Sequence, residues 1–357
     1  MKNNYCIIMA GDIGSRFWPF SRNNRPKQFL DFFGTGRSLL QMTFDRFSRL
    51  MPVENILIVS NILYRDLILE QLPEIKPSQV LLEPNRRNTA PCIAYAVNRI
   101  KSMTDKANIV VAPSDHLIMK EIDFIDAIKT GLDFVEKNDS LLTLGIKPSR
   151  PETGYGYIQI DEGDTNLRKV KTFTEKPNAE LAQIFFETGE FFWNSGIFLW
   201  NLQTIDHAFH SLLPEVALKF DGGKDVYNTA DEQKFIDEMY ATCPNISIDY
   251  GIMEKAANVH VLCSDFGWTD LGTWGSLYEM SEKDVDANVT LKCKTMFYES
   301  KNNIVALPPD KLAVIQELDG YIVAESDNVL LICKLEDEQR IRQFVNDVNV
   351  NQNGQFS

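Results

Sequence analysis

The stretch YCIIMAGDIGSRFWPFSR, residues 5–22, together with PKQFL, residues 26–30, decides the fold. The apolar run over residues 5–10 is typical of a strand buried inside a parallel sheet. It leads directly into a loop that contains Gly11 and Gly14, and a cluster of arginine and lysine side chains follows. Glycine lets backbone N–H groups approach an anion closely, and the cations neutralise phosphate charge. The stretch therefore indicates a nucleotide phosphate site at the carboxyl end of an open α/β sheet.

An ordinary strand-to-helix turn with a solvated basic face would show the same glycines and cations, and on the loop alone that is the better interpretation. Two common phosphate-binding patterns are absent, the G-x-x-x-x-G-K-[ST] loop and the G-x-G-x-x-G fingerprint. The run F-W-P-F-S-R at residues 17–22 and its spacing to P-K-Q-F-L are more specific. They resemble the signature of the sugar-nucleotide pyrophosphorylases, and within them that of the mannose-1-phosphate guanylyltransferases.

This resemblance implies roles for the residues of the loop. It implies that Arg16 and Lys27 are catalytic cations. It also implies that the nucleotide lies against Ala10, Gly11, Gly14 and Ser15. One position departs from the family pattern, because Asp12 stands where the family has glycine. Either this carboxylate lowers activity by meeting the phosphates, or the loop turns it outwards.

Composition bounds the class of protein. The chain has 357 residues, of which 24% are charged and 44% hydrophobic, which is near the average for globular proteins. Its net charge of −14 argues against general binding to nucleic acid or to anionic membranes. The six cysteines are scattered, so we expect free thiols in a reducing compartment. No apolar run is long enough for a signal peptide or a membrane span, and we expect a cytoplasmic protein.

Strand and helix patterns alternate along the first half of the chain, which predicts repeated βαβ units and a Rossmann-like, mainly parallel sheet. Further elements are expected after Pro148, where antiparallel strands begin. The expected strands lie at residues 55–60, 80–82, 108–112, 140–144, 153–158, 170–174, 191–200 and 259–263, and the expected helices at 64–72, 90–101, 124–136, 179–187, 202–213 and 231–240. The resemblance implies a GT-A-like nucleotidyltransferase fold.

A change of texture near residue 283 predicts a domain boundary. Residues 1–283 would form the catalytic domain. Residues 284–357 would form a small β-rich domain that ends in a helix at 336–348. The resemblance implies a short left-handed β-helix there, although no hexapeptide repeat is visible. By analogy it also suggests a homodimer through this region.

The segment EPNRRNTAP, residues 83–91, follows an expected strand and opens an expected helix. Helix capping by Asn88 or Thr89 would alone explain those residues. A second interpretation is base recognition, since guanine presents adjacent N1–H and N2–H donors that a carboxylate such as Glu83 can accept together. The resemblance to the E-P-x-x-R-N-T-A-P segment of guanylyltransferases favours base recognition, and it implies nucleotide contacts by Glu83, Asn88, Thr89 and Ala90.

Two aspartates are candidates for a metal site. Asp115 ends an expected strand in the segment VAPSDH, residues 111–116, and Asp270 lies in WTDLGTW, residues 268–274. Alone, each could be a turn or helix-capping residue. Both segments resemble family motifs, which implies that the two carboxylates hold one Mg²⁺ ion and that Ser114 contacts the nucleotide. His116 is interpreted as a packing or orienting residue.

Sugar recognition needs carboxylates and amides for hydroxyl groups and a cation for the phosphate. The segments FTEKP (173–177) and WNSGIF (193–198) could be a surface turn and a core strand. They also resemble family sugar-binding motifs. The resemblance implies sugar-phosphate contacts by the following residues: Gly154 through its backbone, Glu175, Lys176, Asn194 and Asp249. A helix N-terminus would explain Asp249 equally well.

No serine–histidine or cysteine–histidine nucleophile pattern is evident, and the implied reaction needs none. In it, the ionised phosphate of mannose 1-phosphate attacks the α-phosphorus of GTP and expels pyrophosphate. Two alternatives stay open. One is a pyrophosphorylase for another sugar 1-phosphate or nucleoside triphosphate. The other is a regulatory subunit that binds nucleotide sugars with impaired catalysis, which Asp12 would mark.

Overall fold

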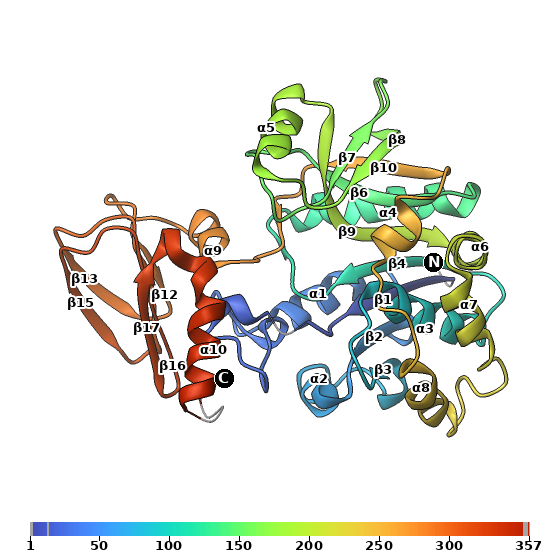
Figure 1. Cartoon of the computed structure of the whole chain (residues 1–357), viewed down its shortest axis with the longest axis horizontal. Coiled ribbons are helices and arrows are strands. Elements are labelled where there is room, and N and C mark those ends of the chain that lie inside the picture. The colour runs from blue at the N-terminus through green and yellow to red at the C-terminus, as the bar shows by residue number, and fades with distance from the viewer. Residues whose placement is uncertain (1–2, 13, 353–355, 357) are drawn as a thin grey trace. The chain divides into compact units, whose positions relative to one another are not determined.

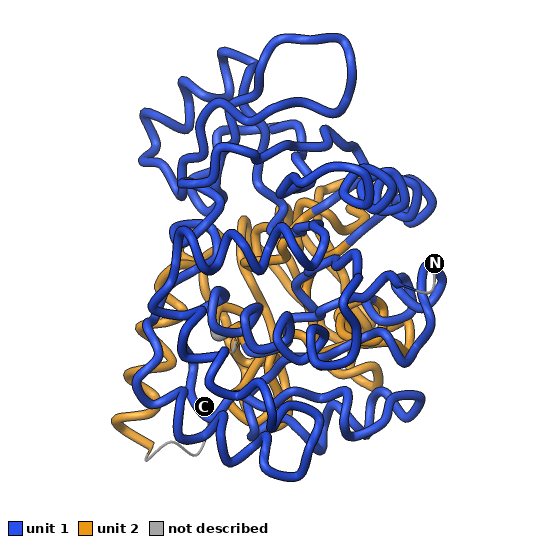
Figure 2. The backbone as a smooth tube through the Cα atoms, turned by 90° about the vertical axis from the view of Figure 1, so that its right-hand side faces the viewer, with its two compact units in different colours: residues 1–11, 43–114, 118–268 blue, residues 12–42, 115–117, 269–357 orange. Residues whose placement is uncertain are grey.

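A computed structural model describes residues 3–12, 14–352 and 356. The chain forms two compact units, coloured separately in Figure 2. Unit 1 comprises residues 1–11, 43–114 and 118–268, and unit 2 comprises residues 12–42, 115–117 and 269–357. The chain passes between units inside the predicted glycine loop and next to both predicted metal aspartates. The predicted boundary near residue 283 falls inside unit 2 and stays a prediction.

The centre of unit 1 is a nine-stranded sheet, visible in Figure 1. In spatial order its strands are β3 (Val80–Glu83), β2 (Ile56–Asn61), β1 (Asn4–Met9), β4 (Asn108–Pro113), β9 (Phe191–Asn201), β6 (Leu141–Ile146), β10 (Val259–Ser264), β8 (Leu167–Thr174) and β7 (Tyr157–Ile160). A short pair is formed by β5 (Leu117–Ile118) and β11 (Trp268–Thr269).

The sheet is mixed, and the expectation of a mainly parallel sheet holds chiefly for its first four strands. Strands β3, β2, β1 and β4 are parallel, as predicted. The antiparallel pairs of β7 and β8 were also predicted, and β6 and β10 are parallel. What was not predicted is β9, which lies between β4 and β6 and is antiparallel to both. A central strand is apolar on both faces whichever way it runs, so the composition of β9 could not show its direction.

Helices cover both faces of the sheet in unit 1. On one face, α3, α6, α7 and α8 pack with β1, β2 and β9 into a single large core. On the opposite face lies α4, where Gly131 fits against Leu142 and Leu199. The helices are α1 (Leu39–Ser48), α2 (Arg65–Gln71), α3 (Thr89–Lys101), α4 (Glu121–Lys137), α5 (Ala179–Thr188), α6 (Leu202–Leu212), α7 (Pro214–Asp221) and α8 (Glu232–Tyr240). Of these, α1 and α7 were not predicted.

The parallel strands bring three predicted site segments to one edge of the sheet. Met9 pairs with Val59 and with Pro113, so β1, β2 and β4 end in register. The backbone N–H of Ala10 donates to Val59 (2.8 Å), and that of Ser114 donates to Met9 (3.0 Å). Glu83 ends β3 beside Asn61. Carboxyl ends of parallel strands are where α/β sheets bind ligands.

Unit 2 contains two small sheets and the helices α9 (Trp274–Met280) and α10 (Ile341–Asn351). The first sheet has the order β12 (Val289–Leu291), β14 (Ile304–Ala306), β16 (Tyr321–Ser326) and β17 (Val329–Lys334), and the second pairs β13 (Lys294–Tyr298) with β15 (Leu312–Gln316). The single helix expected at 336–348 is instead a 3₁₀ turn, η7 (Leu335–Arg340), followed by α10.

The N-terminal part of unit 2 packs on these C-terminal elements. It includes two short 3₁₀ turns, η1 (Ser15–Phe17) and η2 (Lys27–Phe29). Phe17 and Phe32 share one apolar core with Trp274 and with the β12–β17 sheet. The tryptophan-flanked motif at 268–274 therefore belongs partly to this core. Within the described residues, no helix has the length and apolar character needed to cross a membrane.

Candidate active site

The base-recognition candidate Glu83 lies beside the start of the glycine loop, within unit 1. A Cβ atom built on Gly11 would lie 3.5 Å from Oε2 of Glu83. The other carboxylate oxygen, Oε1, accepts a hydrogen bond of 2.8 Å from the hydroxyl of Tyr240 at the end of α8. Both side chains are buried. Burial raises the pKa of Glu83 to about 7, against the opposing effects of Tyr240 and Arg86.

Sequence reasoning missed Tyr240. Tyr240 is the last residue of the helix predicted at 231–240. Its position in the apolar pattern indicates that the side chain is buried, but the pattern does not show which residue its hydroxyl contacts. The contact joins residues 157 positions apart, and only the fold could reveal it.

The other predicted base-site residues make hydrogen bonds within the protein, at the start of α3 and to the segment around residues 246–248. Asn88 has φ 67° and caps α3, its Oδ1 accepting from the N–H of Thr89 (2.9 Å). The hydroxyl of Thr89 accepts from the N–H of Ile248 (2.9 Å), and the N–H of Ala90 donates to Ile246 (3.1 Å). The capping interpretation is thus confirmed for Asn88. A direct contact of these residues with a nucleotide stays a prediction.

Three predicted sugar-site residues lie together in unit 1. Asn194 on β9 donates through Nδ2 to Oδ1 of Asp249 at 2.9 Å. Oε2 of Glu175 would lie 3.0 Å from a Cβ atom built on Gly156. It is buried, with no hydrogen-bond partner within the described part of the chain. Loss of water contact, and then the negative charge of Glu175, raise the pKa of Asp249 to about 6. The exposed Lys176 has its Nζ 3.8 Å from Oε1 of Glu175.

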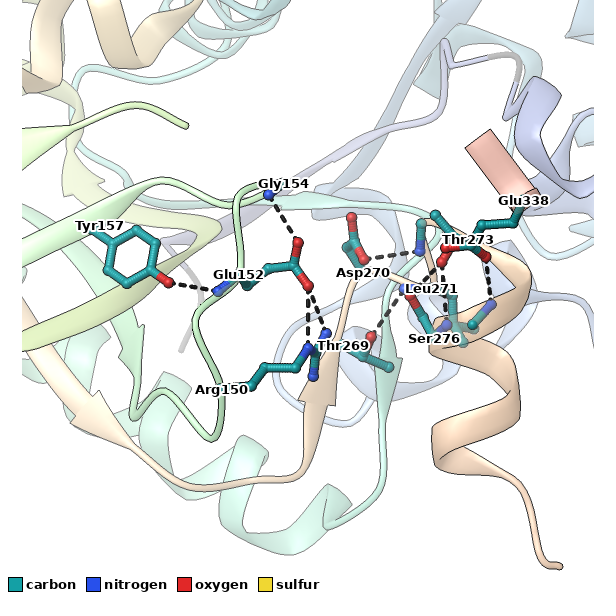
Figure 3. Close-up of polar contacts among 12 residues, drawn as sticks. Arg150, Glu152, Gly154, Tyr157, Thr269, Asp270, Leu271, Thr273, Ser276 and Glu338 are labelled. Atoms are coloured by element: carbon teal, nitrogen blue, oxygen red, sulfur yellow. Dashed lines mark hydrogen bonds and ion pairs between the residues drawn. The ribbon is translucent and has the colours of Figure 1, made fainter. Parts of the chain in front are cut away.

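The loop that carries Gly154 is ordered by an ion pair that sequence reasoning missed (Figure 3). Glu152 accepts from the Nη2 of Arg150 (2.9 Å) through Oε2 and from the N–H of Gly154 (2.9 Å) through Oε1. Its own N–H donates to the hydroxyl of Tyr157 (2.9 Å). Because the N–H of Gly154 is used within the loop, its carbonyl is the backbone group left for a ligand.

In unit 2, Lys27 connects the two metal candidates. Its buried Nζ lies 2.8 Å from Oδ2 of Asp115 and donates to the carbonyls of Asp270 (2.6 Å) and Leu271 (3.0 Å). All three ammonium protons therefore have partners. Burial would raise the pKa of Asp115, but the charge of Lys27 outweighs it and the pKa is lowered. The structure thus places Lys27 in contact with the carboxylate of Asp115 and with the backbone of Asp270, and a metal site shared by the two carboxylates stays a prediction.

The turn that follows Asp270 fixes its carboxylate (Figure 3). Oδ1 of Asp270 accepts from the N–H of Gly272 (2.8 Å), and Leu271 adopts a positive φ of 45°. Thr273 then caps α9 through the N–H of Ser276.

The donor set at Asp115 and Asp270 suits a magnesium ion. No group of three or more metal-ligating side chains occurs among the residues that the structure describes. Magnesium takes one or two carboxylates and completes its shell with water and substrate phosphates. Asp115 and Asp270 supply donors of that type; Lys27 contacts Asp115 through its carboxylate and Asp270 through its backbone carbonyl. His116 places Nε2 4.0 Å from Oδ1 of Asp115, consistent with an orienting role.

The glycine loop in unit 2 is held by the PKQF motif. Gly14 has φ 61°, and a Cβ atom on it would lie 2.5 Å from Cβ of Lys27. Gln28 donates through Nε2 to the carbonyl of Asp12 (2.9 Å), whose side chain is exposed. Nε of Arg16 is buried without a hydrogen bond to any described residue. Ile13 and the side chain of Ser15 lie outside the described part of the structure.

A sheet with a glycine loop after its first strand, and a lysine in contact with the carboxylate of Asp115 and the backbone of Asp270, are features that a nucleotide-transferring enzyme would have. The chain belongs to the nucleotidyl transferase family, whose model matches residues 5–287.

Within that family the chain is similar to several named relatives, among them mannose-1-phosphate guanylyltransferases. It is 33% identical to a mannose-1-phosphate guanylyltransferase of Escherichia coli, over 96% of this chain and 75% of the relative. It is 36% identical to the xanthan biosynthesis protein XanB of Xanthomonas campestris, over 96% of this chain and 72% of the relative. The solved structure of mannose-1-phosphate geranyltransferase from Thermus thermophilus superposes with a TM-score of 0.86 at 29% identity, covering 97% of this chain and 99% of the other.

Proposed function

We propose that this protein transfers GMP from GTP to α-D-mannose 1-phosphate, giving GDP-mannose and pyrophosphate. The similarity to mannose-1-phosphate guanylyltransferases over almost the whole chain supports the choice of substrates. The observation that carries the proposal is the buried carboxylate of Glu83 beside Gly11. It puts an acceptor for the donor edge of guanine next to the loop expected to bind the phosphates.

The sugar is selected by Glu175, Asn194 and Asp249. The buried Oε2 of Glu175 has no hydrogen-bond partner in the described protein, and leaving such an oxygen unpaired is costly. A hydroxyl group of mannose would satisfy it. Asn194 orients Asp249, and the carbonyl of Gly154 offers a further acceptor.

The reaction needs no protein nucleophile. An ionised oxygen of mannose 1-phosphate attacks the α-phosphorus of GTP in line. The bond from that phosphorus to the bridging oxygen breaks, and pyrophosphate leaves with the electron pair. Arg16 stabilises negative charge on the transferred group, and Lys27 holds Asp115 and the backbone of Asp270 in place. A divalent metal ion, which we propose to be Mg²⁺ held by Asp115 and Asp270, would supply further charge neutralisation.

We also propose that the C-terminal strands form a short left-handed β-helix, for which the parallel pairs β12–β14, β14–β16 and β13–β15 are the support. A homodimer through this region and a cytoplasmic location are proposals that rest on the resemblance and on the substrates.

The proposed function is tested by pyrophosphate release from purified protein. GTP with mannose 1-phosphate and Mg²⁺ should give release that EDTA abolishes. Parallel reactions with ATP, UTP, dTTP or glucose 1-phosphate should be much slower. Preference for another pair of substrates would refute the assignment of base or sugar. The exposed Asp12 should be tolerated, so that Asp12→Gly changes turnover only slightly.

A further inference from the structure

The two carboxylate oxygens of Glu83 have different surroundings. Oε2 lies toward Gly11 in the loop after β1. Oε1 accepts the hydroxyl hydrogen of Tyr240, at 2.8 Å. Tyr240 has no part in the transfer reaction as described so far.

Tyr240 is held rigidly in relation to β3. Arg87, four residues after Glu83, donates to the carbonyls of Tyr240 (3.3 Å) and Ala241 (2.8 Å). Nearer the start of α8, Gln233 donates to the carbonyl of Leu82 (3.1 Å), immediately before Glu83. Helix α8 is therefore hydrogen-bonded to the chain on both sides of Glu83, and this holds the helix that carries Tyr240 beside the end of β3.

We propose that Tyr240 is a positioning residue for base selection, whose hydrogen bond keeps the Glu83 carboxylate ionised and oriented to accept the two donors of guanine. This rests on the proposed function, because it takes Glu83 as the group that contacts the base. Each carboxylate oxygen has two lone pairs, so Oε1 can accept from Tyr240 and from a ligand at the same time.

The ionisation state of Glu83 decides which purine fits. Guanine presents two donors, N1–H and N2–H, and an ionised carboxylate only accepts hydrogen bonds. Adenine presents one acceptor, N1, and one donor on N6, which match a protonated carboxyl group that donates one bond and accepts another. Protonation of Glu83 would therefore remove the rejection of adenine.

The surroundings of Glu83 bring its protonated form close in free energy to its ionised form near neutral pH. Burial raises the pKa of Glu83 to about 7, and the two effects that lower it are the Tyr240 hydrogen bond and, after it, the charge of Arg86. Cys92 in α3 and Cys243 after α8 also interact electrostatically with Glu83. Of these groups, Tyr240 does most to favour the ionised carboxylate.

The test compares dissociation constants for GTP and ATP, without sugar phosphate, between about pH 6 and 8. Their ratio cancels the titration of the triphosphate, which both nucleotides share. In the wild type, the preference for GTP should rise as the pH passes through 7. Tyr240→Phe should lower the preference at pH 7 by about tenfold and move its midpoint to higher pH, because one pKa unit corresponds to a tenfold change. Glu83→Gln should make the preference independent of pH.

Tyr95→Phe is the matched control. The Tyr95 hydroxyl donates to Oε1 of the buried Glu232 at 2.9 Å, a bond of the same type in the same unit. This variant should lose similar stability and keep the wild-type ratio and midpoint. Should Tyr240→Phe fail to fold, 3-fluorotyrosine in place of Tyr240 keeps the shape and donates more strongly, and it should move the midpoint to lower pH.

The inference is overturned if the ratio and midpoint stay as in the wild type when Tyr240 is replaced, or if Tyr95→Phe changes them equally. Absence of GTP binding and of turnover in the wild type would instead refute the proposed function itself.

Discussion

At the scale of single residues, Lys27 shows how a motif residue can act through its neighbours. A phosphate-binding lysine was expected, but all three of its ammonium protons are used by Asp115, Asp270 and Leu271. In this state the lysine is the counter-ion of Asp115 and the link to the segment that carries Asp270. We therefore propose that Lys27 holds the carboxylate of Asp115 and the backbone of Asp270 in place before substrates bind.

Replacing Lys27 by methionine should lower kcat by about a hundredfold or more, the usual cost of losing one positioned charge at such a site. The pKa of Asp115 should rise, since its counter-ion is gone. Lys27→Arg is the charge-preserving comparison and should retain more activity. Steady-state kinetics checks the prediction, and a methionine variant with nearly wild-type kcat would contradict it.

The raised pKa of Asp249 predicts a dependence of stability on pH. An aspartate titrates near pH 4 when unfolded, and Asp249 titrates at about 6 in the folded protein. The folded state therefore keeps the proton longer, and this group makes the protein less stable as the pH rises from about 4 to 6. Asp249→Asn removes the titrating group, so its stability relative to the wild type should improve by about 2 kcal/mol between pH 4 and 7.

Denaturant unfolding at the two pH values measures this difference. The exposed Asp105→Asn is the control for loss of one negative charge. A stability difference between wild type and Asp249→Asn that stays constant with pH would show that Asp249 is not held in its protonated form.

At the scale of elements, the sequence predicted local structure well and long-range pairing poorly. The strands at 108–113 and 259–264 and the helices at 89–101 and 179–188 follow from apolar periodicity and caps. The direction of β9 could not be predicted, because it depends on the strands with which β9 pairs, β4 and β6, and these are distant in the sequence.

The contact of η2 with the glycine loop gives a prediction at this scale. Gly14→Ala should destabilise the protein for two reasons, a positive φ of 61° and a Cβ only 2.5 Å from Cβ of Lys27. Gly36→Ala is the control, since it has φ 79° and no atom within 4 Å of its Cβ. Gly36→Ala therefore measures the cost of the positive φ alone, a loss of about 1 kcal/mol in the free energy of unfolding. Gly14→Ala should cost clearly more and should also reduce turnover, as thermal unfolding and kinetics would show. Equal costs would mean that the loop moves away from Lys27 freely.

At the scale of the whole molecule, the motif residues are distributed over both units. Glu175, Asn194 and Asp249 lie together in unit 1, and Lys27 contacts Asp115 and the backbone of Asp270 in unit 2, while their contacts with substrates stay predictions. The chain enters unit 2 as early as Asp12. The sequence pattern does not predict this crossing, because the glycine loop follows the first strand without a break. Tyr240 comes from a segment without a motif, and only folding brings it to Glu83, whereas Glu152 lies in the predicted sugar-site segment but was given no role of its own.

The central claim is that the GMP group of GTP moves to the phosphate of mannose 1-phosphate. It is tested most directly with GTP that carries a radioactive phosphorus label at either the α or the γ position. The account predicts that the α label appears in GDP-mannose and the γ label in pyrophosphate, in equal amounts. Transfer of the γ label to the sugar product, or release of pyrophosphate without any labelled GDP-mannose, would contradict it.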